Sequence, residues 1–189
     1  VALMTESAEL TGKEKVLEVG TGSGYQTAVL AELCLNVFSV EKYGPLAEKA
    51  RVLLDELNYY NVALHVGDGT LGWSEHAPFD AIIVTAGSPE LPRPLIAQLS
   101  IRGRIVLPIG YERSQMLKRF RRTASGLQEE GLVIVDSLNF WGDTVGPINA
   151  EPNFYQSISD QPTETNERDA LLLMSVDERR FTRFSRSVS

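Results

Sequence analysis

A glycine-rich turn between Glu18 and Tyr25 is the segment of this sequence best suited to chemistry. It reads Glu-Val-Gly-Thr-Gly-Ser-Gly-Tyr and follows a short apolar run that begins at Lys15. Glycines in such a turn let the backbone approach a ligand closely and adopt positive φ angles. The turn therefore predicts a ligand site where a first strand passes into a first helix.

The spacing of this turn disfavours two classes of ligand. A loop that cradles nucleoside triphosphates needs a lysine directly after its last glycine, and no lysine lies between Lys15 and Lys42. A dinucleotide loop needs glycine or alanine where Tyr25 stands, because a larger side chain blocks the pyrophosphate. We therefore expect neither a nucleoside triphosphate nor NAD or FAD at this turn.

Three carboxylates accompany the turn, one at each of three successive strand ends. Glu18 precedes the first glycine by two residues, Glu41 ends the second apolar run, and Asp68 stands between two glycines after the third. Because the carboxyl ends of parallel strands border one crevice, we expect the three to line a single site. Glu41 suits ribose hydroxyls, Asp68 an adenine amino group, and Glu18 a ligand with positive charge and no phosphate. The set indicates S-adenosyl-L-methionine.

The elements that position these residues alternate between short apolar runs and helical patterns, which is typical of an α/β domain around a parallel sheet. We predict strands, each covered on both faces, at residues 15–19, 36–40, 61–66, 80–84 and 104–109. Apolar spacings of three and four predict helices at 25–35, 45–57 and 92–99. Residues 114–122 and 131–140, joined by Ser125 and Gly126, predict a closing antiparallel hairpin.

Composition narrows the function further. The 189 residues carry a net charge of −7, one cysteine and two histidines. The negative charge argues against nucleic acid and anionic lipid as partners, and no apolar run is long enough to span a membrane. Cys34 alone forms no intrachain disulfide, and neither histidine has a partner at metal-ligand spacing. We expect a cytoplasmic, monomeric protein without a metal site.

The chain is expected to divide after Gly146. Residues 1–146 predict one domain, and residues 147–189 predict a polar linker followed by a short helix over 169–184. The opening residues have a helical pattern without a preceding Met, so we expect the sequence to begin inside a longer gene product. One basic run, expected to be a solvated strand edge, comprises Arg113, Lys118, Arg119, Arg121 and Arg122.

Several segments together resemble the protein-L-isoaspartate O-methyltransferase family over residues 1 to about 145. They are the opening Val-Ala-Leu-Met-Thr-Glu, residues 16–26 with the glycine turn, 67–69, 72–73, 75–86 and 114–117. The resemblance implies a Rossmann-like, doubly wound class I methyltransferase fold. It also implies methyl transfer from S-adenosyl-L-methionine to the free carboxylate of L-isoaspartyl or D-aspartyl residues in damaged proteins and peptides, as a step of protein repair.

The resemblance also implies which residues bind the cofactor. The family's cofactor positions fall on Ser23, Glu41, Lys42, Asp68, Gly69 and Gln115. The turn completes the predicted set with Glu18, Gly20, Thr21, Gly22 and Gly24. The family's Thr-Ile-Ser-Gln-Pro-Tyr motif, whose serine lies at the reacting carboxylate, comes upstream of the opening string. We therefore expect an N-terminally truncated member whose catalytic serine precedes Val1.

Two other functions stay open at this stage. One is a methyltransferase with another acceptor. Enzymes that methylate base amino groups carry an Asn/Asp-Pro-Pro-aromatic loop after the fourth strand, where this chain has Thr-Ala-Gly-Ser-Pro at 85–89, so a small-molecule acceptor is the stronger form of this alternative. The other is a relative that binds the cofactor without catalysing transfer.

Overall fold

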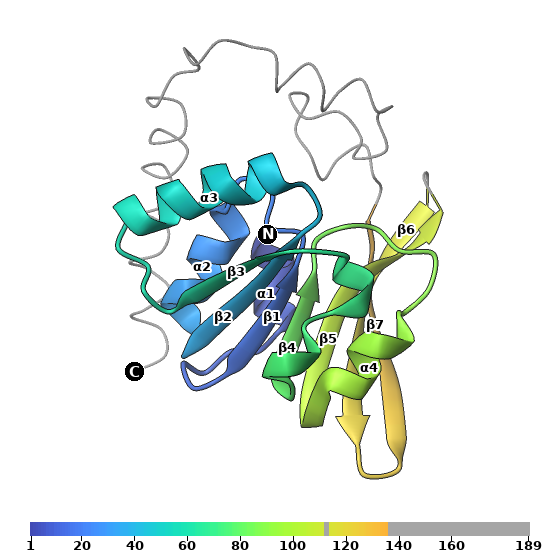
Figure 1. Cartoon of the computed structure of the whole chain (residues 1–189). Coiled ribbons are helices and arrows are strands. Elements are labelled where there is room, and N and C mark those ends of the chain that lie inside the picture. The colour runs from blue at the N-terminus through green and yellow to red at the C-terminus, as the bar shows by residue number, and fades with distance from the viewer. Residues whose placement is uncertain (112–113, 136–189) are drawn as a thin grey trace. The chain divides into compact units, whose positions relative to one another are not determined.

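Seven strands form one sheet in the computed structural model, which describes residues 1–111 and 114–135 (Figure 1). Their spatial order is β3-β2-β1-β4-β5-β6-β7. Their bounds are β1 (Lys15–Val19), β2 (Asn36–Glu41), β3 (Val62–Val66), β4 (Phe79–Val84), β5 (Leu99–Tyr111), β6 (Ser114–Thr123) and β7 (Gly126–Val135).

The helices are short and lie between the strands along the chain. They are α1 (Ala2–Ser7), α2 (Tyr25–Leu33), α3 (Gly44–Glu56) and α4 (Arg93–Gln98), with 3₁₀ turns η1 (Gly69–Leu71) and η2 (Ser74–His76). Proline lies in the first turn of α3 and of α4, where its missing N–H breaks no helical hydrogen bond. Within the described residues no helix is long and apolar enough to cross a membrane.

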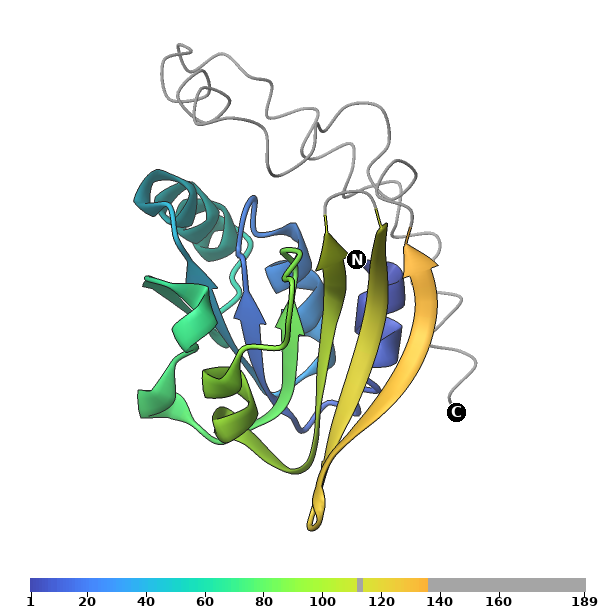
Figure 2. The same ribbon diagram turned by 90° about the vertical axis from the view of Figure 1, so that its right-hand side faces the viewer.

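The sheet is doubly wound. β1 to β5 pair in parallel, whereas β6 and β7 pair antiparallel beside β5 as long strands (Figure 2). The chain moves outward from β1 to β3 and then crosses to β4 on the other side of β1, so the strand order reverses between β1 and β4. In sheets of this kind ligands bind outside the carboxyl ends of the strands at that reversal. The α/β, Rossmann-like fold with a C-terminal antiparallel hairpin is confirmed.

Each face of the sheet has its own apolar core. On one face, residues of α1 and α2 such as Met4 and Leu30 pack on Val16 and Ile83. On the other, Leu95 of α4 belongs to the cluster built on alternate strand residues of β1, β4 and β5. Successive residues of a strand point to opposite faces, which is why Val16 and Leu17 of β1 lie in different cores.

One strand differs from its predicted surroundings. β3 was expected to be covered on both faces, but it is the edge of the sheet. Its residues Val62 to Leu64 are half-buried, and His65 and Val66 are exposed. An apolar run alone does not distinguish an edge strand from a central one, because the neighbours of a strand are fixed by long-range topology.

Two predicted boundaries are also wrong. β5 begins at Leu99 rather than at 104, because Leu99 pairs with Phe79 before an irregularity shifts the register to Arg104 opposite Ala81. β7 begins directly after the turn, at Gly126 rather than at 131. The predicted strand residues 136–140, Arg113, the domain boundary after 146, the linker and the helix over 169–184 lie outside the described residues.

The basic run is not a solvated edge. β6 lies inside the sheet, and Glu9, which follows α1, accepts from both Arg119 (2.7 Å) and Arg121 (2.9 Å). Arg119 also pairs with Glu130 of β7, and Lys118 with Glu129. Glu9 and acidic residues of the neighbouring strand therefore neutralise Lys118, Arg119 and Arg121, whereas Arg122 donates to the carbonyl oxygens of residues 96, 97 and 99.

Candidate functional site at the carboxyl end of the sheet

The glycine turn is held by its contact with β4. Gly20 has φ +98°, and a Cβ placed on it would lie 2.3 Å from Oγ1 of Thr85, the residue that follows β4. The Thr85 hydroxyl donates toward the carbonyl oxygens of Val19 (3.0 Å) and Gly20 (2.8 Å). Only glycine satisfies both the angle and the contact, so the sequence of the turn follows from its place against Thr85.

Glu41 fastens the turn to the end of β2. Its side chain is buried, and Oε2 accepts from the backbone N–H of Gly22 (2.9 Å) while Oε1 accepts from the N–H of Tyr43 (2.9 Å). A carboxylate oxygen has a second lone pair, so Glu41 retains acceptor capacity for a ligand. The structure thus brings two residues of the predicted site, Gly22 and Glu41, together at neighbouring strand ends.

Glu18 lies beneath the turn rather than on an open surface. It is fully buried, and its Oε2 accepts from the hydroxyls of Thr27 on α2 (2.5 Å) and Ser39 on β2 (2.6 Å). Its Oε1 has no hydrogen-bond partner among the described residues. Burial raises the pKa of Glu18 to about 7; the two hydroxyl donors act in the opposite direction, and the charge of Glu41 raises it further.

Ser39 links Glu18 to the glycine turn. Ser39 is the register partner of Glu18 in the parallel β1–β2 pair, and its Oγ also lies 2.6 Å from Oγ1 of Thr21. Because Ser39 gives its single proton to Glu18, the hydroxyl of Thr21 is the donor in the second bond. Thr27, Glu18, Ser39 and Thr21 therefore form one buried chain of hydrogen bonds, which we call the buried relay.

Sequence reasoning missed Thr27, Ser39 and Thr85. The available signal was polarity at core positions: Thr27 stands three and four residues before Leu30 and Ala31 on the buried face of α2, and Ser39 lies two residues after the buried Val37. A buried hydroxyl calls for a partner, and here the partner is the acid of the turn.

Asp68 occupies a different part of this end of the sheet. Its side chain is exposed and accepts from the N–H (2.9 Å) and hydroxyl (2.8 Å) of Thr70, and these bonds, with the charge of Lys42, lower the pKa of Asp68. The adjacent Gly69 passes so close to Val19 that a Cβ would lie 2.3 Å from its Cγ1. A cavity of about 230 Å³ beside Asp68 is lined by His65 and residues 71–75.

The structure joins some of the predicted site residues by hydrogen bonds and leaves others apart. Glu18, Thr21, Gly22 and Glu41 are joined by hydrogen bonds, whereas Asp68 lies beside Lys42 without a bond to that group among the contacts described. Ser23 is exposed in the turn, and Gly24 begins α2 as its N-cap. Gln115 of β6 lies against Gly87, in the loop after β4, where a Cβ would meet its Nε2 at 2.2 Å. The assignment of these residues to a cofactor stays a prediction.

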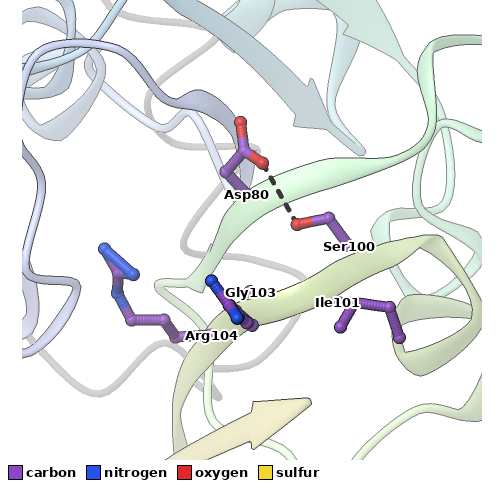
Figure 3. Close-up of a pocket in the computed structure, with 6 residues that line it drawn as sticks. Asp80, Ser100, Ile101, Gly103 and Arg104 are labelled. Carbon is purple, nitrogen blue, oxygen red and sulfur yellow. Dashed lines mark hydrogen bonds between the residues drawn. The ribbon is translucent and has the colours of Figure 1, made fainter. Parts of the chain in front are cut away.

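The opposite end of the sheet has a second acid and hydroxyl pair. Asp80, near the start of β4, accepts from the hydroxyl of Ser100 (3.1 Å) and from the backbone N–H of Lys15 (3.0 Å). Figure 3 shows these side chains beside a cavity of about 160 Å³, with Arg104 and Gly103 also at its wall. This end has no glycine-rich turn, and Asp80 fastens the starts of β1, β4 and β5 together.

The family model that matches this chain and two of its similar relatives carry the same description. The family model of protein-L-isoaspartate(D-aspartate) O-methyltransferase matches residues 1–135. The protein-L-isoaspartate O-methyltransferase of Syntrophus aciditrophicus is 58% identical over 129 residues, which cover 68% of this chain and 59% of that protein. That of Trichlorobacter lovleyi is 56% identical over 134 residues, covering 70% of this chain and 62% of that protein. The chain thus spans about three fifths of the length of these two relatives.

Solved structures give the same picture. A protein-L-isoaspartate O-methyltransferase structure has a TM-score of 0.67 at 32% identity, covering 71% of this chain and 44% of the other. A protein from Plasmodium falciparum, described as a putative member in complex with S-adenosyl-L-homocysteine, has a TM-score of 0.57 at 23% identity, covering 71% of this chain and 67% of the other, and supports the fold. The chain belongs to the protein-L-isoaspartate(D-aspartate) O-methyltransferase family.

Proposed function

We propose that this chain forms the cofactor-binding part of an enzyme that methylates the free carboxylate of L-isoaspartyl or D-aspartyl residues in damaged proteins, with S-adenosyl-L-methionine as methyl donor. The family supports this proposal, as does the name that the relatives carry. The observation that carries it is the glycine turn fastened to Glu41 at the reversal of strand order.

The residues at this end of the sheet fit the cofactor chemically. Glu41 keeps free lone pairs next to the N–H of Gly22, which suits vicinal ribose hydroxyls. Asp68 is an exposed acceptor at the next strand end, which suits an amino group of adenine. The turn from Gly20 to Gly24 holds no lysine or arginine, so it is suited to a ligand without phosphate.

The reaction asks little acid or base chemistry of the protein. S-adenosyl-L-methionine, when bound, would supply a methyl group on a positively charged sulfur. An oxygen of the acceptor carboxylate would form the new C–O bond to this methyl group, and the electron pair of the broken S–C bond would stay on sulfur. The acceptor carboxylate is ionised at pH 7, so no residue is needed to remove a proton. The residues of the turn then act by placement, which can supply most of the rate gain.

Methyl transfer from radiolabelled S-adenosyl-L-methionine to an isoaspartyl peptide tests the proposal, with the aspartyl peptide as control. Both this chain and the gene product extended upstream of Val1 are assayed. We expect a base-labile methyl ester on the isoaspartyl peptide alone, formed by the extended protein, since the family's serine motif precedes the opening string. Binding of the cofactor without transfer by either form would contradict the substrate and would favour another acceptor or an inactive relative.

The proposal also covers the compartment, the oligomeric state and the partners of the enzyme. We propose that it acts in the cytoplasm as a monomer, on isoaspartyl proteins and peptides and without nucleic acid or membrane partners. The single cysteine, Cys34, is buried and free, which suits a reducing compartment. Light scattering of the purified protein at micromolar concentration checks the monomer, and a dimer mass would contradict it.

A further inference from the structure

The acid of the turn is not placed to touch a ligand. Glu18 is fully buried, and the two groups that reach its Oε2 are hydroxyls from α2 and β2. Sequence reasoning assigned Glu18 to contact with a positively charged ligand, on its spacing to the first glycine alone. The geometry points to another role, in which Glu18 acts on the ligand site through its neighbours.

Two hydrogen bonds, the backbone between Thr21 and Gly22, and a third hydrogen bond connect Glu18 to Glu41, the residue expected to hold ribose. From Glu18 the bonds run to Ser39 and then to Thr21, and the next N–H in the turn, that of Gly22, donates to Glu41. Thr21, Thr27 and Ser39 are all at most 3% exposed. The position of the turn relative to Glu41 therefore depends on hydroxyls that no ligand can reach.

We propose that Ser39 and Thr27 are positioning residues for S-adenosyl-L-methionine, which hold the Glu18 carboxylate and, through Thr21, fix the glycine turn against Glu41. This inference rests on the proposed function, because it concerns the same cofactor. Ser39 has the larger role, since it bonds both Glu18 and Thr21, whereas Thr27 bonds Glu18 alone.

The charge on Glu18 gives the relay a property that simple packing lacks. Among the described residues, β2 contributes the nearby carboxylate of Glu41, α2 contributes the uncharged Thr27, and β4 contributes the apolar Ile83 as register partner. Hydroxyl donors favour the ionised form of the acid. Removal of Ser39 or Thr27 should therefore raise the pKa of Glu18 further, so that the affinity for cofactor changes with pH differently in the variant and in the wild type.

The test measures the dissociation constant of S-adenosyl-L-homocysteine by calorimetry from pH 6 to pH 9. We expect Ser39→Ala to weaken binding about tenfold and Thr27→Val about threefold, as for loss of one buried hydrogen bond. We expect the deficit of Ser39→Ala to change with pH. We also expect the double variant Ser39→Ala, Glu18→Gln to bind better than Ser39→Ala, because a neutral amide has less need of two hydroxyl donors.

Ser100→Ala is the matched control. It removes a serine hydroxyl that also donates to an acid, Asp80, at the other end of the sheet (Figure 3), so its affinity should equal that of the wild type. Equal affinities for Ser39→Ala and Ser100→Ala, or a deficit that is the same at every pH and is not relieved by Glu18→Gln, would overturn the inference. A wild-type chain that fails to bind would instead overturn the proposed function, and this inference with it.

Discussion

Glu14 and Glu18 stand at opposite ends of β1, and both are buried, yet their surroundings push their pKa values in opposite directions. Burial raises the pKa of Glu14, but bonds from the N–H (2.9 Å) and hydroxyl (2.7 Å) of Thr11 and from the N–H of Lys13 (3.0 Å) outweigh it, and the pKa is lowered. Glu18 has two hydroxyl donors and a pKa raised to about 7.

The difference between these acids shows what each end of the sheet does. Glu14 satisfies backbone groups of its own loop and stabilises the fold. Glu18 leaves one oxygen without a partner among the described residues, directly under the glycine turn. A buried acid that is incompletely satisfied costs stability, and proteins tolerate such groups where function needs them.

The largest effect should come from adding one methyl group to the turn. Gly20→Ala places a Cβ 2.3 Å from Oγ1 of Thr85 at φ +98°, so we expect the turn to be displaced and binding of S-adenosyl-L-homocysteine to fall by more than about 3 kcal/mol. Gly12→Ala is the control at the amino end, since it has a similar φ of +93° and open space around its Cβ. Calorimetry on both variants checks the prediction. Similar affinities of Gly20→Ala and Gly12→Ala for S-adenosyl-L-homocysteine would contradict it and would show that the turn accommodates the added methyl group.

The two glutamates should give opposite pH dependence of stability. The folded-state pKa of Glu18 lies above its value of 4.5 in the unfolded chain, so its contribution to stability is present below pH 4.5 and is lost as the pH rises through about 7. Relative to Glu18→Gln, the wild type should lose roughly 2 to 3 kcal/mol of unfolding free energy between pH 5 and pH 8. Urea denaturation at the two pH values measures this difference.

Glu14→Gln should show the opposite pH dependence of stability. Because the folded-state pKa of Glu14 is lowered, its contribution is present above pH 4.5 and is lost as the pH falls through the folded-state value. Near pH 7, Glu14→Gln should therefore be less stable than the wild type, and the deficit should shrink in acid. Parallel pH profiles for the two glutamine variants would contradict the contrast drawn between them.

Glu41→Ala tests whether the carboxyl end of the sheet binds ligand through Glu41. Glu41→Ala removes the acceptors expected to take ribose hydroxyls, and we expect a loss of about 1 to 3 kcal/mol in binding of S-adenosyl-L-homocysteine. Equilibrium dialysis gives the dissociation constant, with Glu14→Ala as the control that loses stability without losing affinity. An unchanged dissociation constant for Glu41→Ala would contradict the assignment of Glu41 to the ribose.

The smallest effect is expected at the surface ion pairs near Glu14. Glu9 is about half exposed and pairs with Arg119 and Arg121, so Glu9→Gln should cost at most about 1 kcal/mol of unfolding free energy and should lose that cost in high salt. Urea denaturation with and without 1 M salt measures it. A larger loss of unfolding free energy that does not depend on salt would contradict this prediction, because it would mean that these pairs stabilise the fold as much as Glu14 does.

The sequence predicted what is local and repetitive in this molecule. The alternation of apolar runs and helices located β1, β2, β4 and α2 to α4 closely, and the glycine turn with Glu41 came from spacing alone. It did not predict that β3 is an edge or that the basic run is paired, because both depend on segments far apart in the chain. The buried relay was missed because serine and threonine add little to a hydrophobic pattern.

The arginine contacts at the end of α1 bear on the order in which the chain folds. Arg104 donates to the carbonyl oxygens of Ala8 and Glu9 (both 2.5 Å), and Arg119 to that of Ser7 (3.2 Å), across separations of 95 to 112 residues. Contacts between residues so distant close only after a large loss of chain entropy. α1 should therefore be among the last elements to dock, after β5 and β6 have formed.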